Sequence, residues 1–126
     1  MTTTIENGFG SRLMTDGGFL LNNELTDFSF TSFKNGKKVA NSIEPSKRPR
    51  SSMAPTIILK NNKPVYILGS PGGSNIIGYV VNAIISMIDW EKNAQEAASV
   101  DHGINKFGTY YFCLLYTSDA ADDSAC

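Results

Sequence analysis

The sequence predicts a mixed α+β fold in which strands precede helices along the chain, and three observations support this. Short apolar runs with the composition of strands are scattered through the chain up to Leu68. An apolar run with helical spacing follows, from about Ser74 to Asp89. Hydrophobic residues make up 41% of the 126 residues and charged residues 18%, which is typical of one globular domain. A sheet and helices are therefore expected to pack in layers.

The first part of the chain contains few predicted elements. Residues 2–5 form a short β-prone run that Gly8 and Gly10 interrupt. Residues 19–21 are predicted to form a short buried strand. Residues 31–50 are poor in apolar side chains and rich in Lys, Asn, Ser and Pro. We expect a long surface loop there, and loops of this length are usually functional or mobile.

The second part of the chain has stronger patterns. Residues 56–59 and 65–68 are apolar runs on either side of the polar segment KNNKP, which predicts a β-hairpin. A helix is predicted from about residue 74 to 89, with Ser74 or Asn75 as its N-cap. Its Ile and Val side chains share one broad face, at positions 76, 77, 80, 81, 84, 85 and 88. A second, shorter helix is predicted over residues 91–98.

The segment GSPGGS, residues 69–74, lies between the hairpin and the long helix. Gly72 and Gly73 let the backbone approach a ligand closely, and a helix start points N–H groups at that ligand. Such a turn can hold a phosphate, a carboxylate or the oxyanion of an acyl-transfer intermediate. The Lys of a Walker loop and the spaced glycines of a Rossmann fingerprint are both missing. By itself, the pattern fits a purely structural turn equally well.

Two other polar pairs could bind a ligand. Glu24 and Asp27 are three residues apart, so both carboxylates can face one guest. We favour an ammonium group over a metal as that guest, because no third acid or His is nearby. Ser51 and Ser52 precede a predicted strand, and their hydroxyls can donate hydrogen bonds to a carboxylate. Each pair alone is also typical of a solvated turn or strand start.

Composition argues against several functional classes. The formal net charge is −1, and the basic cluster KRPR at residues 47–50 has no interleaved aromatic stripe, so nucleic-acid binding is not expected. No apolar run is long enough to span a membrane. His102 is the only histidine and nothing places it near a nucleophile, so we interpret it as a surface residue. We expect no metal and no cofactor.

The end of the chain has a different character. Both cysteines, Cys113 and Cys126, lie in residues 113–126. The segment CLLYTSDAADD that begins at Cys113 resembles the translation of a transposon-type sequencing-library adapter. We therefore expect residues 1–112 to be gene-derived sequence and residues 113–126 to be a non-native tail, and we draw no redox inference from the cysteines.

Four blocks of sequence together carry a specific resemblance. TTTIENGFGS, GGFLLNNELTDFSF, KRPRSSMAPTI and GSPGGSNII resemble, in this order, the small subunit of bacterial γ-glutamyltransferases, also called γ-glutamyltranspeptidases, over residues 1–112. The resemblance implies part of the four-layer αββα sandwich of N-terminal-nucleophile hydrolases. It also implies a precursor that cleaves itself into a large and a small subunit, which remain partners. The new N-terminal Thr of the small subunit would attack the γ-glutamyl amide of a donor such as glutathione.

The resemblance gives a role to the glycine pair and the acidic pair. Gly72 and Gly73 match the glycines whose N–H groups form the oxyanion hole. Glu24 and Asp27 match the acids that bind the donor's α-ammonium group. These roles agree with the chemistry that each pair offers by itself.

The resemblance also covers the hydroxyl pair and two residues near the start. Ser51 and Ser52 match the hydroxyls that hold the α-carboxylate, and Thr4 matches the threonine that hydrogen-bonds the nucleophile. Glu6 stands near the substrate, where many members have Asn, which leaves open a different donor, including the glutaryl type used by cephalosporin acylases. The nucleophilic Thr is expected upstream of Thr4, outside this chain, so the fragment alone is expected to be inactive.

Two alternatives belong to other classes. A non-catalytic module could capture an anion such as phosphate at Gly72 and Gly73, although this would leave the acidic and hydroxyl pairs without a role. A degenerate, inactive family member is the other alternative. The family resemblance implies a location in the periplasm or outside the cell.

Overall fold

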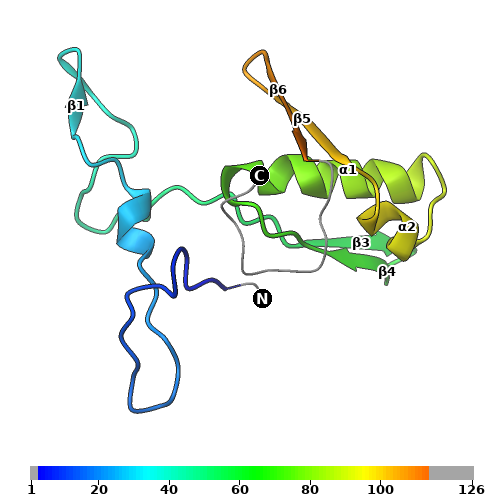
Figure 1. Ribbon diagram of the computed structural model, residues 1–126, viewed down its shortest axis with the longest axis horizontal. Helices are drawn as coiled ribbons and strands as arrows, with labels where there is room; N and C mark the ends of the chain where they lie inside the picture. Colours follow the sequence, from blue (N-terminus) through cyan, green and yellow to red (C-terminus); the bar gives the residue numbers. More distant parts are fainter. Residues whose placement is uncertain (1–2, 114–126) are drawn as a thin grey trace. The chain divides into compact units, whose positions relative to one another are not determined.

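The computed structural model describes residues 3–113, and the chain divides into two compact units, Met1–Ser51 and Ser52–Cys126. The first unit contains the 3-10 helix η1 (Glu24–Asp27) and the strands β1 (Phe33–Lys34) and β2 (Lys37–Lys38). The second contains, in order, β3 (Thr56–Lys60), β4 (Lys63–Leu68), η2 (Gly73–Asn75), α1 (Ile76–Ile88), α2 (Ala94–Ala98), β5 (His102–Lys106) and β6 (Thr109–Cys113) (Figure 1). Apart from Cys113, the tail proposed for residues 113–126 lies outside the described residues.

The first unit is largely irregular, and the predicted strand at residues 19–21 is wrong. Leu20 forms only an isolated antiparallel bridge with Met14. Phe19 is 62% exposed and Leu21 is 43% exposed, so the run is not buried. The reason is that a short apolar run needs a paired strand and a covering face to be buried. Here the Leu21 N–H and C=O instead close a loop by hydrogen bonds to Leu13 and Ser11.

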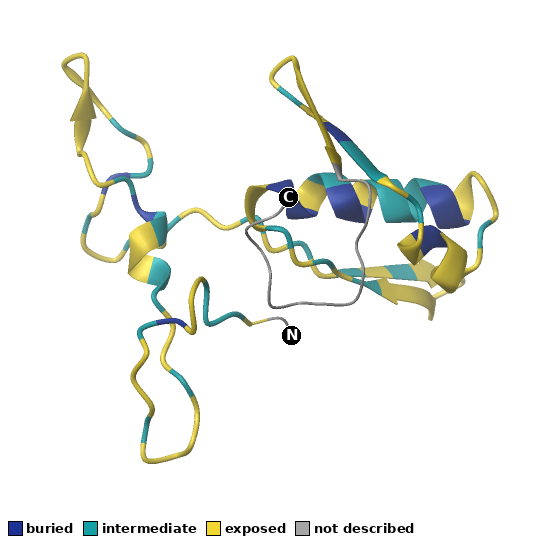
Figure 2. Ribbon diagram, viewed as in Figure 1, coloured by how far each residue is buried: buried dark blue, intermediate teal, exposed yellow. Residues whose placement is uncertain are grey.

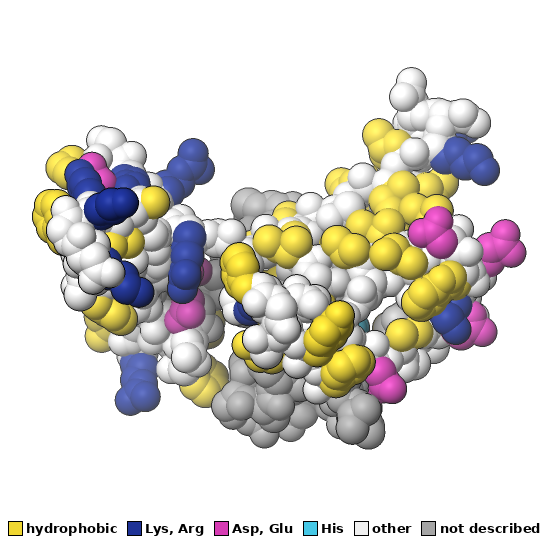
Figure 3. Space-filling view, turned by 90° about the horizontal axis from the view of Figure 1, so that it is seen from above, with side chains coloured by type: hydrophobic (Ala, Val, Ile, Leu, Met, Phe, Trp, Pro, Cys, Tyr) yellow, Lys and Arg dark blue, Asp and Glu magenta, His cyan; other side chains and the backbone are white. Residues whose placement is uncertain are grey.

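The long surface loop predicted for residues 31–50 is confirmed, because β1 and β2 are its only regular elements and have two residues each. Lysine and arginine side chains gather over this unit (Figure 3). Within the loop, the Glu44 carboxylate lies 2.9 Å from Lys47 Nζ and 3.0 Å from Lys38 Nζ. Hydrogen bonds from Lys47, Lys38 and Ser42 lower the pKa of Glu44 to about 2.

The predicted hairpin is confirmed in the second unit. β3 and β4 pair antiparallel from Thr56 opposite Leu68 to Lys60 opposite Lys63. Figure 2 shows that most of this hairpin is exposed, and its members include Ile57 at 62% and Ile67 at 76% exposure. The two apolar runs and the polar turn therefore predicted the pairing correctly, although neither face of the hairpin is fully covered by described residues.

Helix α1 starts two residues later and ends one residue earlier than predicted, and η2 occupies its expected first turn. The prediction of one broad buried face is only partly right. The buried positions are Ile76, Tyr79, Val80, Ser86 and Met87, whereas Ile77, Val81 and Ile88 are about half exposed. Tyr79, Ser86 and Met87 lie outside the predicted face, so the buried stripe is rotated relative to that face. Strand β5 and helix α2 pack against α1.

The second helix, α2, is shorter than predicted and begins after Asn93. The Asn93 side chain accepts a hydrogen bond from the Glu96 N–H, and the Glu96 carboxylate accepts one from the Asn93 N–H, both at 2.9 Å. This capping box fixes where the helix starts, so residues 91–93 lie outside it.

The hairpin β5–β6 was not predicted, so the order of strands followed by helices is incomplete. β5 lies along α1, and Asn82 Nδ2 donates to the Gly103 carbonyl at 2.8 Å. Ile104 is buried against Gly78. A Cβ atom on Gly78 would lie 2.5 Å from Cγ2 of Ile104. Strand and helix can touch this closely only because Gly78 has no side chain. Among the described residues, no helix has the length and apolar composition needed to cross a bilayer.

Candidate functional site

The Gly72–Gly73 turn joins β4 to the start of η2 in a conformation that requires glycine. The φ angles are 125° at Gly72 and 51° at Gly73, and both lie in the region that L side chains rarely adopt. Neither η2 nor α1 has a side-chain cap, so no capping side chain covers the first N–H groups. Helix-start N–H groups of this kind attract negative charge, which supports the sequence prediction of an anion-binding turn.

Two side chains that the sequence analysis missed support this turn. Tyr79, only 3% exposed, lies directly beneath it, and a Cβ on Gly72 would come 2.6 Å from the ring atom Cε2. Lys106 Nζ, at the end of β5, donates to Ser74 Oγ at 2.7 Å and to Asn75 Oδ1 at 3.0 Å. Tyr79 lies outside the helical face predicted from the Ile and Val positions, so no sequence signal indicated this contact. The Lys106 contact needs the unpredicted strand.

His102 is not the surface residue that the sequence analysis expected. It is half-buried on β5, and its ring stacks on Tyr79 with 4.3 Å between centroids. Burial lowers the pKa of His102, and the charge of Asp101 partly opposes that effect. The histidine therefore belongs to the packing under the turn, as a neutral ring against an aromatic neighbour.

The acidic pair predicted from sequence forms η1 in the first unit, where a third acid joins it. Glu24 and Asp27 begin and end η1, and both are half-buried. Burial, a hydrogen bond with Asp27 and the charges of Asp27 and Glu6 all raise the pKa of Glu24. Glu6 therefore lies close enough to act on the same carboxylate. A crowded acidic group of this kind favours a cationic guest such as an ammonium group.

Asn23 connects the two segments that carry these acids. Its Oδ1 accepts from the Asn7 N–H and its Nδ2 donates to the Asn7 carbonyl, both at 3.3 Å. Its own N–H also donates to the Ile5 carbonyl at 3.3 Å. These bonds hold Glu6 and Glu24 near each other. The sequence analysis treated Asn23 only as the end of an apolar run, and no local pattern distinguishes it from other turn asparagines.

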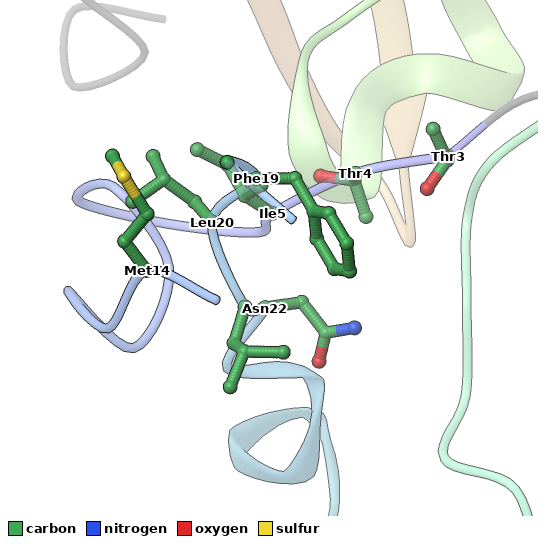
Figure 4. A pocket seen from close by; sticks show the side chains of 9 residues that line it. Thr3, Thr4, Ile5, Met14, Phe19, Leu20 and Asn22 are labelled. Carbon is green, nitrogen blue, oxygen red and sulfur yellow. The ribbon is translucent and has the colours of Figure 1, made fainter. Parts of the chain in front are cut away.

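Thr4 lies in the same unit, beside the acids. Its Oγ1 accepts a hydrogen bond from the Glu6 N–H at 2.8 Å. It also lines an open hollow of about 700 Å³ (Figure 4). The other lining residues are Thr3, Ile5, Met14, Gly18, Phe19, Leu20, Leu21 and Asn22. The first unit thus brings together Thr4, Glu6, Glu24 and Asp27.

Ser51 and Ser52 lie just before β3, where the two units meet along the sequence. Ser51 is exposed and Ser52 is half-buried. Serine hydroxyls can donate hydrogen bonds to a carboxylate, which is the role predicted for both residues. Within residues 3–113, no group of three or more His, Cys, Asp or Glu side chains has the arrangement of a metal site.

Comparisons with known proteins point to one family. Residues 1–109 match the family model described as gamma-glutamyltranspeptidase. The glutathione hydrolase proenzyme of Bacillus subtilis is 50% identical over 90 residues, which cover 71% of this chain and 14% of that protein. The chain therefore spans only a small part of the length of this curated relative.

Solved structures agree with the sequence matches. A gamma-glutamyltranspeptidase variant from Helicobacter pylori has a TM-score of 0.72 and 46% identity, covering 85% of this chain and 61% of that chain. A highly active mutant from Pseudomonas nitroreducens has a TM-score of 0.77 and 29% identity, covering 99% and 70%. These likenesses confirm the predicted α+β fold of the N-terminal-nucleophile hydrolase type.

Proposed function

This chain belongs to the gamma-glutamyltranspeptidase family, and we propose that the full-length protein hydrolyses γ-glutamyl amides such as glutathione and transfers their γ-glutamyl group. The observation that carries the proposal is the family match over residues 1–109, a range that includes every site residue expected from the sequence. The same match does not favour a non-catalytic module for phosphate, which has no use for the acidic group on η1.

The first part of the proposal concerns how the donor binds. Glu24 and Asp27 bind the α-ammonium group, and Ser51 and Ser52 donate hydrogen bonds to the α-carboxylate. The raised pKa of Glu24 supports the first role, because neighbouring negative charges that repel one another gain from a shared cation. Two charged groups on one donor carbon then fix the orientation of the γ-amide.

The second part concerns the chemistry at the γ-carbonyl carbon. A threonine hydroxyl upstream of Thr4 attacks this carbon, and the N–H groups of Gly72 and Gly73 stabilise the oxygen that becomes negative. Collapse of the intermediate expels the amine and leaves an ester with the threonine. Water then releases glutamate, or an amine acceptor takes the γ-glutamyl group. Thr4 supports the attacking hydroxyl by a hydrogen bond.

The proposal extends to the origin of the protein. The chain corresponds to a fragment of the small subunit of a precursor that cleaves itself, and the large subunit of the same precursor is its partner. No cofactor is needed, because the nucleophile, the oxyanion donors and the donor-binding groups are all protein groups.

A glutaryl-type donor is the closest rival, and the acidic group on η1 argues against it. A glutaryl chain lacks the α-ammonium and offers only a carboxylate. Three acids, Glu6, Glu24 and Asp27, would repel that carboxylate instead of binding it. Glu6 in place of the usual Asn therefore strengthens the preference for a donor with a positive charge.

The test is a direct comparison of donors by the full-length protein. We expect release of p-nitroaniline from γ-glutamyl-p-nitroanilide and much slower release from glutaryl-p-nitroanilide. Asp27→Ala should raise the KM for the γ-glutamyl donor by about tenfold or more, because a charged contact to the ammonium is lost. Asp16→Ala, at an exposed acid of the same unit, is the matched control. Binding of inorganic phosphate without cleavage of either anilide would refute the proposal.

A further inference from the structure

We infer that Asn41 is a positioning residue that sets the spacing between the ammonium-binding acids of η1 and the segment that leads into Ser51. The inference rests on the proposed function, and it adds a residue that determines how the α-amino acid end of the donor is held. Asn41 lies in the long loop between these two segments, 14 residues after Asp27 and nine residues before Arg50.

The Asn41 side chain uses both ends of its amide as a bridge. Nδ2 donates to the carbonyl of Asp27, the last residue of η1, at 2.6 Å. Oδ1 accepts from the N–H of Arg50, the residue before Ser51, at 3.0 Å. The two bonds fix the orientation of the amide, because only one orientation gives each backbone group its complement. One side chain therefore links the end of the acidic turn to the start of the hydroxyl pair.

The surrounding backbone makes this link rigid. The Ser29 N–H donates to the Asn41 carbonyl at 2.9 Å, and Ser29 forms a parallel bridge with Ser42. Ser42 is fully buried and Phe28 is 6% exposed, so the loop closes on the small core of the first unit. Residues 30–40 extend outward from the bridge between Ser29 and Ser42. The length of this segment can vary without changing the distance between Asp27 and Arg50.

Spacing matters because the donor carries its ammonium and carboxylate on one carbon atom. The groups that bind them must keep a fixed separation, and a shift of about 1 Å in a positioned group costs a large factor in productive binding. Aspartate at position 41 keeps the shape and the acceptor for Arg50, but places an oxygen against the Asp27 carbonyl. Alanine removes both bonds. Neither change touches the residues assigned to the chemistry.

The experiment compares steady-state kinetics of full-length wild type, Asn41→Asp and Asn41→Ala with γ-glutamyl-p-nitroanilide. We expect KM to rise about tenfold or more in both variants, because the acids of η1 shift when the part-buried hydrogen bond to the Asp27 carbonyl is lost, while kcat per folded enzyme changes by less than about threefold. Asn35→Asp makes the same chemical change at the exposed tip of the β1–β2 hairpin, and it should leave both constants unaltered.

Each result has a definite meaning. An active wild type with unchanged KM in Asn41→Asp overturns the inference and leaves the proposed function intact. A loss of total activity with unchanged KM and unchanged kcat per folded enzyme assigns Asn41 to folding alone and also overturns the inference. A wild type that cleaves no γ-glutamyl anilide overturns the proposed function and this inference together. If the variants do not fold, amide exchange in the wild type decides, because fast exchange at the Arg50 N–H would contradict the bridge.

Discussion

Replacing Gly72 by alanine is the sharpest test of the oxyanion hole proposed at the Gly72–Gly73 turn. The φ angle of 125° at this residue is unfavourable for any L side chain. The new Cβ would also lie 2.6 Å from Cε2 and 2.9 Å from Cδ2 of Tyr79. Tyr79 is 3% exposed and stacks on His102, so its ring has no free space in which to retreat. The turn must therefore move.

The expected loss of activity depends on whether the turn stays in place under strain or shifts and loses hydrogen-bond donors. Backbone strain at such a residue costs about 1–3 kcal/mol if the turn stays in place. If the turn shifts, the N–H groups no longer face the developing oxyanion, and one lost donor costs about 2.7–4 kcal/mol. We therefore expect Gly72→Ala to lower kcat by about 100-fold to 1,000-fold, with little change in donor KM.

Gly73→Ala is the matched control, because it tests strain without the collision. A Cβ on Gly73 meets no atom within 4 Å, and its φ of 51° lies in the left-handed helical region. Such a conformation costs an alanine about 1–2 kcal/mol, and the N–H is retained. We expect kcat to fall by no more than about tenfold.

The assay is release of p-nitroaniline from a γ-glutamyl donor by processed full-length enzyme, with thermal denaturation to confirm that both variants are folded. The diagnostic quantity is the ratio of the two kcat values. Equal activity of Gly72→Ala and Gly73→Ala would refute the reasoning, because only Gly72 contacts Tyr79. Full activity of Gly72→Ala would show that the Gly72 N–H is not a donor in the oxyanion hole.

Three further outcomes follow from single contacts. Gly78→Ala should lower the melting temperature, because the new Cβ would lie 2.5 Å from Ile104 Cγ2, although alanine by itself favours helices. A higher melting temperature would show that β5 does not pack against α1 at Gly78. Lys106→Met should lower kcat about tenfold at unchanged KM by freeing the turn, and Lys106→Arg should retain most activity. Asp27→Asn should stabilise the fold at neutral pH. Because the pKa of Glu24 is raised in the folded state, the stability that Glu24 contributes is present at low pH and is lost as pH rises through that pKa. Removing the neighbouring negative charge of Asp27 therefore stabilises the fold only above that pKa. Urea titrations at one pH below and one pH above it would show the difference.

The sequence predicted those parts of the fold that depend on local patterns. The hairpin β3–β4 follows from two apolar runs around a polar turn, and α1 follows from a continuous apolar run after the glycines. Pairing of Glu24 with Asp27 could also be predicted, because a spacing of three places both on one turn. In each of these cases, the interacting residues are near each other in the chain.

The features that the sequence did not predict depend on distant contacts. Gly103 and Asn105 in β5 and Gly108 in the turn before β6 are typical of a loop. β5 pairs with β6 and also packs against α1, where Asn82 and Gly103 are 21 residues apart. The half-buried state of His102 depends on the same packing. Asn41 looks like any loop asparagine until Asp27 and Arg50 are seen on either side of its amide.

Two local costs in this chain lie at residues assigned to function. Glu6 has a φ of 69°, unusual for a side chain of its size, and it adds negative charge to a carboxylate whose pKa is already raised by burial. Glycine at position 72 loses more conformational freedom on folding than a residue with a side chain would, but it allows a conformation that exposes N–H groups. By contrast, the α2 start at Asn93 satisfies its own backbone groups with a complete capping box. Selection for stability alone would remove the first two features and keep the third, which agrees with the assignment of the chemistry to the acids and the glycine turn and not to α2.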